Sequence, residues 1–129
     1  MIVLLCARSF SGKSTLAEAL ARQLPATVVS LDAINAERGL HGGQGIPIDE
    51  WSRTNEVARD RTRGGIADGV TVVVDDTSSP RFLRDGWRAL ADSRVCPWCS
   101  YTSTRRLRCR WNGIAPTAIT RWVTTSMMP

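Results

Sequence analysis

The hydrophobic pattern of the first third of the chain predicts a strand, a helix and a second strand. Residues 2–6 (IVLLC) form a continuous apolar run, as in a parallel strand covered on both faces. After Gly12 the apolar residues recur at helical spacing until Pro25, which ends the pattern. Residues 27–31 (TVVSL) predict the second strand. The apolar positions of the helix are Leu16, Ala17, Leu20, Ala21 and Leu24.

The middle of the chain predicts a glycine-rich loop followed by a helix and a third strand. The loop covers residues 39–48 (GLHGGQGIPI). A helix is expected to open near Asp49, because an acidic residue suits a helix N-terminus. It would run through Trp51, Val57 and Ala58 towards Gly64 and Gly65. Residues 70–74 (VTVVV) predict the third strand.

A last helix is expected after this strand, with Ser79 as its N-cap and Pro80 at its first position. We expect its buried face to hold Phe82, Leu83, Trp87 and Leu90. Strands that alternate with helices predict an α/β fold with a parallel sheet. Only three strands are clear, and no fourth strand is visible after Arg94, so the sheet is predicted to be incomplete.

The chain shows no sign of a membrane span or an export signal. No apolar run reaches about 18 residues, and the N-terminus lacks a basic start and a small-residue cleavage site. Four cysteines in such a chain favour a reducing compartment. We therefore expect a cytoplasmic protein with free thiols.

The composition changes at about residue 94. Residues 1–94 hold 12 acidic and 12 basic residues, whereas 95–129 hold five arginines and no acid, which gives the net charge of +5. Three of the five tryptophans and three of the four cysteines also lie in 95–129. We therefore divide the chain into a core, 1–94, and a basic, irregular tail, 95–129.

The segment from Ala7 to Thr15 (ARSFSGKST) has Walker A spacing, with Ala7 in the place of the first glycine. It lies between a predicted strand and a predicted helix, where backbone N–H groups converge on phosphate oxygens. Lys13 would bind the β- and γ-phosphates, and the Ser14 hydroxyl would ligate Mg²⁺. Gly12 allows the backbone to approach closely. The predicted nucleotide-binding residues are Ser9, Phe10, Ser11, Gly12, Lys13, Ser14 and Thr15.

Acidic residues follow the second and third strands. Ligands of a doubly wound sheet bind at the carboxyl ends of its strands, so Asp32 could accept the proton of a substrate hydroxyl. Alternatively, Asp32 only caps the next helix. Asp75 is the first choice for holding Mg²⁺ and Asp76 the second, while one of them could cap the turn through Thr77. The single histidine, His41, is expected to be exposed to solvent.

With these motifs, residues 1–94 resemble the P-loop kinases of small molecules and polynucleotide ends, which include chloramphenicol-phosphotransferase-like and zeta-toxin-like proteins. The resemblance rests on the phosphate loop at 7–15, on SLD at 30–32 and on VVVDDT at 72–77. It implies a P-loop NTPase three-layer sandwich that uses ATP and Mg²⁺ and transfers the γ-phosphate to a hydroxyl of a small molecule or nucleic-acid end. The catalytic residues would be Lys13 and Asp32.

The chain departs from this family's pattern in several places. Phe10 stands where many such kinases have a second glycine. Many relatives have an acceptor-binding arginine three residues after the aspartate, where this chain has Asn35, with Arg38 one turn further. Relatives also have an arginine-bearing lid and further strands, which residues 95–129 do not supply in recognisable form. The alternative function is a non-catalytic nucleotide-binding fragment whose basic tail binds nucleic acid.

Three interpretations of the tail remain open. Cys96, Cys99 and Cys109 offer three metal ligands, whereas zinc needs four, and a redox CxxC needs a helix start that is not visible. A second interpretation is a nucleic-acid-binding arm, supported by composition alone; the arginines Arg105, Arg106, Arg108 and Arg110 could also imitate a lid. We favour a shifted reading frame, because acidic residues and periodicity disappear together.

Codon degeneracy permits the shifted frame after Arg94 to encode GLPVVLVHVDAPLEV, an apolar strand and a helix start. Some codons are forced, since Trp98–Cys99 must give valine, Trp111–Asn112 glutamate and Met127–Met128 aspartate. Resequencing the gene across codons 90 to 100 tests this hypothesis. A base missing from or added to the recorded sequence, but not to the gene, would mean that the native protein is a complete kinase. A shift in the gene itself would indicate a decayed kinase. An unshifted gene would make the tail a true extension.

Overall fold

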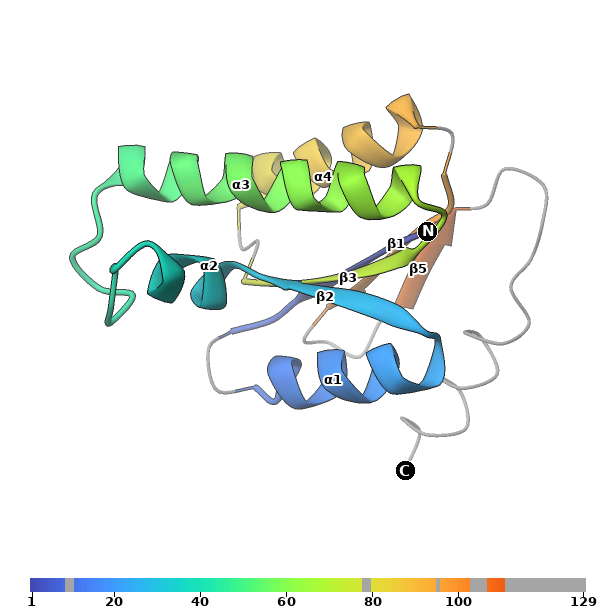
Figure 1. Cartoon of the computed structure of the whole chain (residues 1–129), viewed down its shortest axis with the longest axis horizontal. Helices are drawn as coiled ribbons and strands as arrows, with labels where there is room; N and C mark the ends of the chain where they lie inside the picture. Colours follow the sequence, from blue (N-terminus) through green and yellow to red (C-terminus); the bar gives the residue numbers. More distant parts are fainter. Residues whose placement is uncertain (9–10, 78–79, 95, 103–106, 111–129) are drawn as a thin grey trace.

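The computed structural model of the chain describes residues 1–8, 11–77, 80–94, 96–102 and 107–110 (Figure 1). Strands and helices alternate along most of these residues, as the hydrophobic pattern predicts. The elements are β1 (Ile2–Cys6), α1 (Lys13–Gln23), β2 (Ala26–Ser30), α2 (Leu31–Glu37), α3 (Ile48–Ala67), β3 (Thr71–Asp76), α4 (Arg81–Ser93), β4 (Trp98–Thr102) and β5 (Leu107–Arg110). Each predicted strand is found within a residue or two of its expected bounds.

The five strands form one sheet in the order β2-β3-β1-β4-β5, in which β5 alone runs antiparallel to its neighbour. β1 lies at the centre, between β3 and β4, and all five of its residues are buried. Its register places Cys6 beside Asp76 of β3 and Thr102 of β4. The carboxyl ends of the parallel strands therefore meet at one edge of the sheet.

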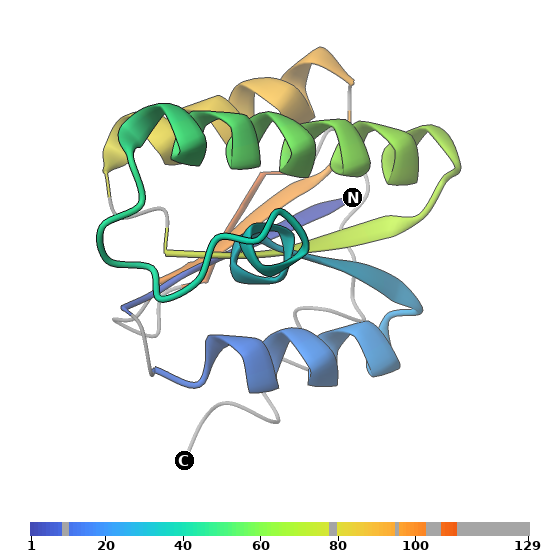
Figure 2. The ribbon, with the colours of Figure 1, turned by 60° about the vertical axis from the view of Figure 1, so that its left-hand side comes forward.

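Helices cover both faces of the sheet, as Figure 2 shows: α3 and α4 lie over one face and α1 over the other. Alternate residues of β1 serve the two sides, so that Ile2 and Leu4 pack beneath α3 and α4, whereas Val3 and Leu5 pack with Ala17 of α1. The predicted three-layer α/β sandwich is thus confirmed, and the continuous apolar run of β1 reflects burial on both faces.

Two strands lie in the tail, so the expectation of a sheet with three strands and an irregular tail is wrong at β4 and β5. β4 pairs in parallel with β1, and β5 follows it as an antiparallel edge strand. Trp98 and Cys99 of β4 are buried, whereas Ser100, Tyr101 and Thr102 are half-buried, so the strand lacks the clear apolar pattern of β1. The shifted frame also predicts a strand at this place, so the presence of β4 does not test that hypothesis, which stays a prediction.

The predicted buried face of α4 is wrong at Phe82. This side chain is 71% exposed, whereas Trp87 and Leu90 are buried and Leu83 is half-buried. Phe82 precedes Trp87 by five residues, which is about 1.4 helical turns, so the two side chains point in different directions. Pro80 occupies the N-cap position and the helix begins one residue later than expected. The predicted cap Ser79 lies outside the described residues.

The expectation of four free thiols is also wrong in part. Cys99 is disulfide-bonded, whereas Cys6 and Cys96 are free.

Within the part of the chain that the structure describes, no helix is long and apolar enough to cross a membrane.

Candidate active site

The phosphate loop joins the centre of the sheet to α1. Gly12 precedes the helix with a φ of +83°, a left-handed conformation that glycine adopts without strain. The carbonyl oxygen of Arg8 accepts hydrogen bonds from the Ser11 N–H at 3.3 Å and from Lys13 Nζ at 3.1 Å. These bonds hold Lys13 against the loop at the N-terminus of α1. Two predicted loop residues, Ser9 and Phe10, lie outside the described residues.

A direct hydrogen bond connects the phosphate loop to the end of β3. The Ser14 hydroxyl donates to Asp75 Oδ2 at 2.8 Å, although the two residues are 61 positions apart. Asp75 and Asp76 are 8% and 7% exposed, so their carboxylates lie in the floor of the site rather than in bulk solvent. Hydroxyl and carboxylate oxygens are hard donors that suit Mg²⁺. The residues present therefore fit a magnesium ion held at the Ser14–Asp75 pair.

Cys6 lies at the end of β1, where the register places Asp76 beside it. Burial of the thiol, and secondarily the charge of Asp76, raises its pKa to about 12. The thiol therefore stays protonated at neutral pH and acts as an apolar part of the floor. We did not single out Cys6 from the sequence, where it reads only as the last residue of an apolar strand.

Asp32 lies in the first turn of α2, directly after the end of β2. Its side chain is exposed, and no described residue forms a hydrogen bond or ion pair with it. The N-cap of α2 is instead Ser30, whose Oγ accepts a hydrogen bond from the Ala33 N–H at 3.3 Å. The alternative that Asp32 serves as the helix cap is therefore wrong. Its role as a base stays a prediction.

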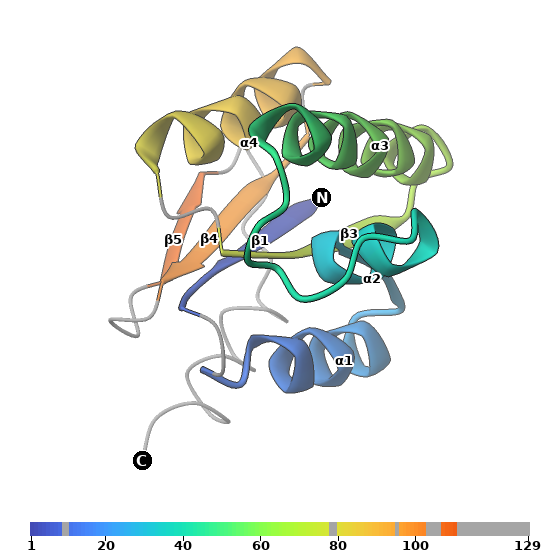
Figure 3. The ribbon, with the colours of Figure 1, turned by 90° about the vertical axis from the view of Figure 1, so that its left-hand side faces the viewer.

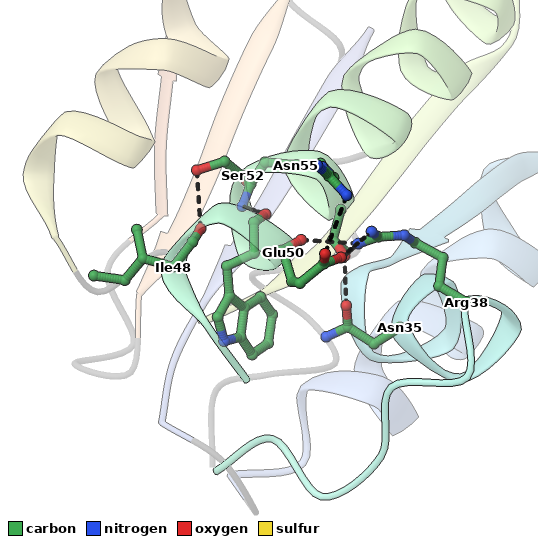
Figure 4. Close-up of polar contacts among 9 residues, drawn as sticks. Asn35, Arg38, Ile48, Glu50, Ser52 and Asn55 are labelled. Carbon is green, nitrogen blue, oxygen red and sulfur yellow. Dashed lines mark hydrogen bonds and ion pairs between the residues drawn. The ribbon is translucent and has the colours of Figure 1, made fainter. Parts of the chain in front are cut away.

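A hydrogen-bonded network connects α2, the helix that carries Asp32, to α3 (Figure 4). Arg38 donates through Nη1 to the Glu50 carbonyl oxygen at 2.8 Å and to Thr54 Oγ1 at 2.7 Å. Its Nη2 forms an ion pair with the Glu50 carboxylate. Thr54 in turn donates its hydroxyl hydrogen to Asn35 Oδ1. Thr54 is fully buried and Asn35 is 3% exposed.

This network changes the interpretation of the residues that follow Asp32. Asn35 faces Thr54 inside the protein, and the charge of Arg38 is neutralised by Glu50. Both side chains are thus used for packing α2 against α3 instead of reaching a ligand. No local sequence pattern indicates these contacts, because each partner lies 12 to 19 residues away on a different helix.

The loop between α2 and α3 carries the single histidine. His41 is exposed, as expected. Its neighbours Gly39, Gly42, Gly43 and Gly45 all have positive φ values, which explains why this loop is rich in glycine. Among the described residues, no group of three or more histidine, cysteine or acidic side chains is placed to hold a metal ion.

A parallel α/β sandwich with a glycine–lysine–serine loop between the central strand and a helix defines the P-loop class of proteins. Within that class, a family model described as an AAA domain matches residues 2–111. The chain therefore belongs to this AAA-domain family, and the predicted resemblance to P-loop proteins is confirmed. A comparison with curated protein sequences finds no match.

Solved structures of kinases share the fold. A cysteine-to-alanine mutant of the APS kinase of Mycobacterium tuberculosis aligns with a TM-score of 0.68 and 16% identity, over 98% of this chain and 93% of that one. The same kinase in complex with AMPPNP and APS gives 0.61 and 16%, over 99% and 75%. A gluconokinase from Sinorhizobium meliloti 1021 gives 0.56 and 20%, over 78% of this chain. This chain spans 55% of the gluconokinase.

We predict that Thr54→Val destabilises the protein by about 1–3 kcal/mol, because the buried Asn35 oxygen loses its donor. Valine keeps the shape of the side chain, so little packing is lost. Urea unfolding of the full chain measures the change.

Ser52→Ala is the matched control, because Ser52 is exposed and, in the described part of the chain, its hydroxyl bonds only to the Ile48 carbonyl oxygen of its own helix. We expect it to change the free energy of unfolding by no more than about 0.5 kcal/mol. Equal effects of the two variants would show that the network does not stabilise the packing of α2 on α3.

Proposed function

We propose that this chain is the core of a Mg²⁺- and ATP-dependent phosphotransferase that delivers the γ-phosphate to a hydroxyl group. The hydrogen bond between Ser14 and Asp75 carries the proposal, because it brings the phosphate loop and the carboxyl end of β3 together as a magnesium site requires. The family membership and the shared fold of several kinases support it. A structural neighbour that binds AMPPNP makes a nucleotide the natural ligand of the loop.

The nucleotide would lie along the phosphate loop at the start of α1. The N–H groups of residues 11–15 would bind phosphate oxygens, and Lys13 would exchange its bond to the Arg8 carbonyl for the β- and γ-phosphates. Ser14 and Asp75 would hold Mg²⁺, which neutralises charge on the transferring phosphate. Asp76 follows Asp75 at the end of β3 and is also buried, so it is the second candidate for holding the ion.

The acceptor hydroxyl would approach from the side of α2. Asp32 would take its proton as the new O–P bond forms and the bond from the γ-phosphorus to the bridging oxygen breaks, so that ADP leaves. The Arg38–Glu50–Thr54–Asn35 network would act as a positioning device, because it fixes the helix that carries Asp32. Action in the cytoplasm is part of the proposal and is supported by the free thiols of Cys6 and Cys96, whereas the disulfide at Cys99 is a feature that a reducing compartment does not favour.

We predict that Lys13→Ala lowers the affinity for a fluorescent ATP analogue with Mg²⁺ by about ten- to a hundredfold, the expected loss of a hydrogen-bonded charge. Equilibrium titration of the full chain measures it. The matched control is Arg22→Ala, which removes an exposed charge from the last turn of the same helix and should leave the affinity unchanged.

The same titration distinguishes the roles of Asp75 and Asp76. Asp75→Asn should abolish the gain in affinity that Mg²⁺ confers, whereas Asp76→Asn should only reduce it, since Ser14 bonds to Asp75. Nucleotide binding that ignores Lys13 and Asp75 would defeat the proposed site.

We further predict that Asp32→Asn slows ATP turnover about 10²–10⁴-fold without changing ATP affinity, because a general base acts only in the chemical step. Release of ADP by the full chain, with the nucleotide saturating, measures the rate. Glu18→Gln, an exposed acid on α1, is the control and should retain full turnover.

Wild-type protein that binds ATP without any turnover would favour the non-catalytic alternative. In that case salt-sensitive binding of DNA or RNA, lost on deleting residues 95–129, would identify the basic tail as the functional part.

A further inference from the structure

A positively charged groove, separate from the phosphate loop, is lined by residues of α3 and α4. Figure 3 shows these two helices side by side over the same face of the sheet. The groove has a volume of about 510 Å³, and its lining includes Arg59 and Arg63 of α3 together with Arg94 at the end of α4. None of these residues belongs to the nucleotide site. Arg94 leads to β4, whose Trp98 pairs with Ile2 at the amino end of β1, whereas Asp75 lies near the opposite end of the sheet.

Contacts with α4 hold the Arg59 side chain in place in this groove. Its guanidinium carbon lies 5.6 Å from the centre of the Trp87 ring, a cation–π contact that orients the charge. Gly86 of α4 leaves the space it needs, because a Cβ at that position would lie 2.4 Å from Arg59 Nη2. The Nε atom of Arg59 is buried and has no hydrogen-bond partner in the described part of the chain.

The charges around the groove do not balance. Arg63 pairs with Asp60, but no described carboxylate forms an ion pair with Arg59 or Arg94. Asp92, which lies near Arg94 in the sequence, already has an interaction of its own. The C-terminal ends of α3 and α4 each contribute only about half a negative charge. The Arg59 guanidinium, which is partly buried, therefore lacks a full compensating charge, and such a charge is costly. Arg94 is exposed and adds a solvated positive charge to the groove.

We propose that this groove is a binding site for a small phosphorylated anion, distinct from the nucleotide site. Guanidinium groups bind phosphate oxygens through paired N–H donors, and three arginines from the two helices line this groove. An anion would supply the missing partner of Arg59 and neutralise Arg94. Binding of an anion in this groove does not depend on the proposed catalytic function, because the groove contains no residue of the phosphate loop and neither Asp75 nor Asp76.

Pyrophosphate is the probe, and the Lys13→Ala chain is the background, because that change weakens binding at the phosphate loop. We expect titration calorimetry at constant ionic strength to show one pyrophosphate bound to this variant. Adding Arg59→Met should weaken binding at least about tenfold, the expected loss of one charged hydrogen-bonding group. Adding Gly86→Ala should weaken it too, since the new methyl group displaces the Arg59 guanidinium.

The matched control is Arg22→Met, which removes an equal charge from an exposed position on α1 and should leave pyrophosphate binding unchanged. If Arg59→Met fails to fold, the double variant Arg63→Met with Arg94→Met tests the same groove from its rim. Absence of pyrophosphate binding to the Lys13→Ala chain would overturn the proposal. So would equal binding by the groove variants, or binding of a DNA duplex without binding of pyrophosphate.

Discussion

The central position of β1 is the constraint on which the rest of the structure depends. This strand has parallel hydrogen-bonding partners on both edges and helices over both faces, so every one of its five residues must be apolar. Because its neighbours run in the same direction, their polar ends arrive together at one edge of the sheet. The phosphate loop leaves β1 at that same edge, which is why Ser14 and Asp75 meet although 61 positions separate them.

Burial explains the hydrogen bonding and the protonation of the side chains at this edge of the sheet. Asp75 and Asp76 follow directly from a fully buried run of valines, and the Ser14 hydroxyl compensates Asp75. The same burial keeps the Cys6 thiol protonated, since a thiolate beside Asp76 would place two negative charges together in a poorly solvated floor. The floor of the site thus offers carboxylates that can bind a cation, while the protonated Cys6 thiol is a poor nucleophile.

Periodicity and the phosphate-loop spacing predicted the part of the fold and site that rests on local sequence. The three apolar strands, α1, α3 and the places of Lys13 and Asp75 along the chain follow from patterns of a few residues. What the patterns missed depends on partners distant in sequence. Asn35 and Arg38 look available for a ligand until α3 supplies Thr54 and Glu50, and β4 becomes a strand only through its pairing with β1. Phe82 shows that an apolar residue near a helix start need not share its buried face.

The network between α2 and α3 bears on which acceptors the site would favour. An arginine pointing into the acceptor region would attract an anionic substrate, but here Arg38 forms an ion pair with Glu50 and Asn35 is turned inward. The position three residues after Asp32 therefore contributes packing instead of charge. Uncompensated arginines occur instead in the groove between α3 and α4, towards the amino ends of the strands. The ion-paired Arg38 thus helps to order the proposed base, whereas the arginines that line the groove between α3 and α4 would attract an anion.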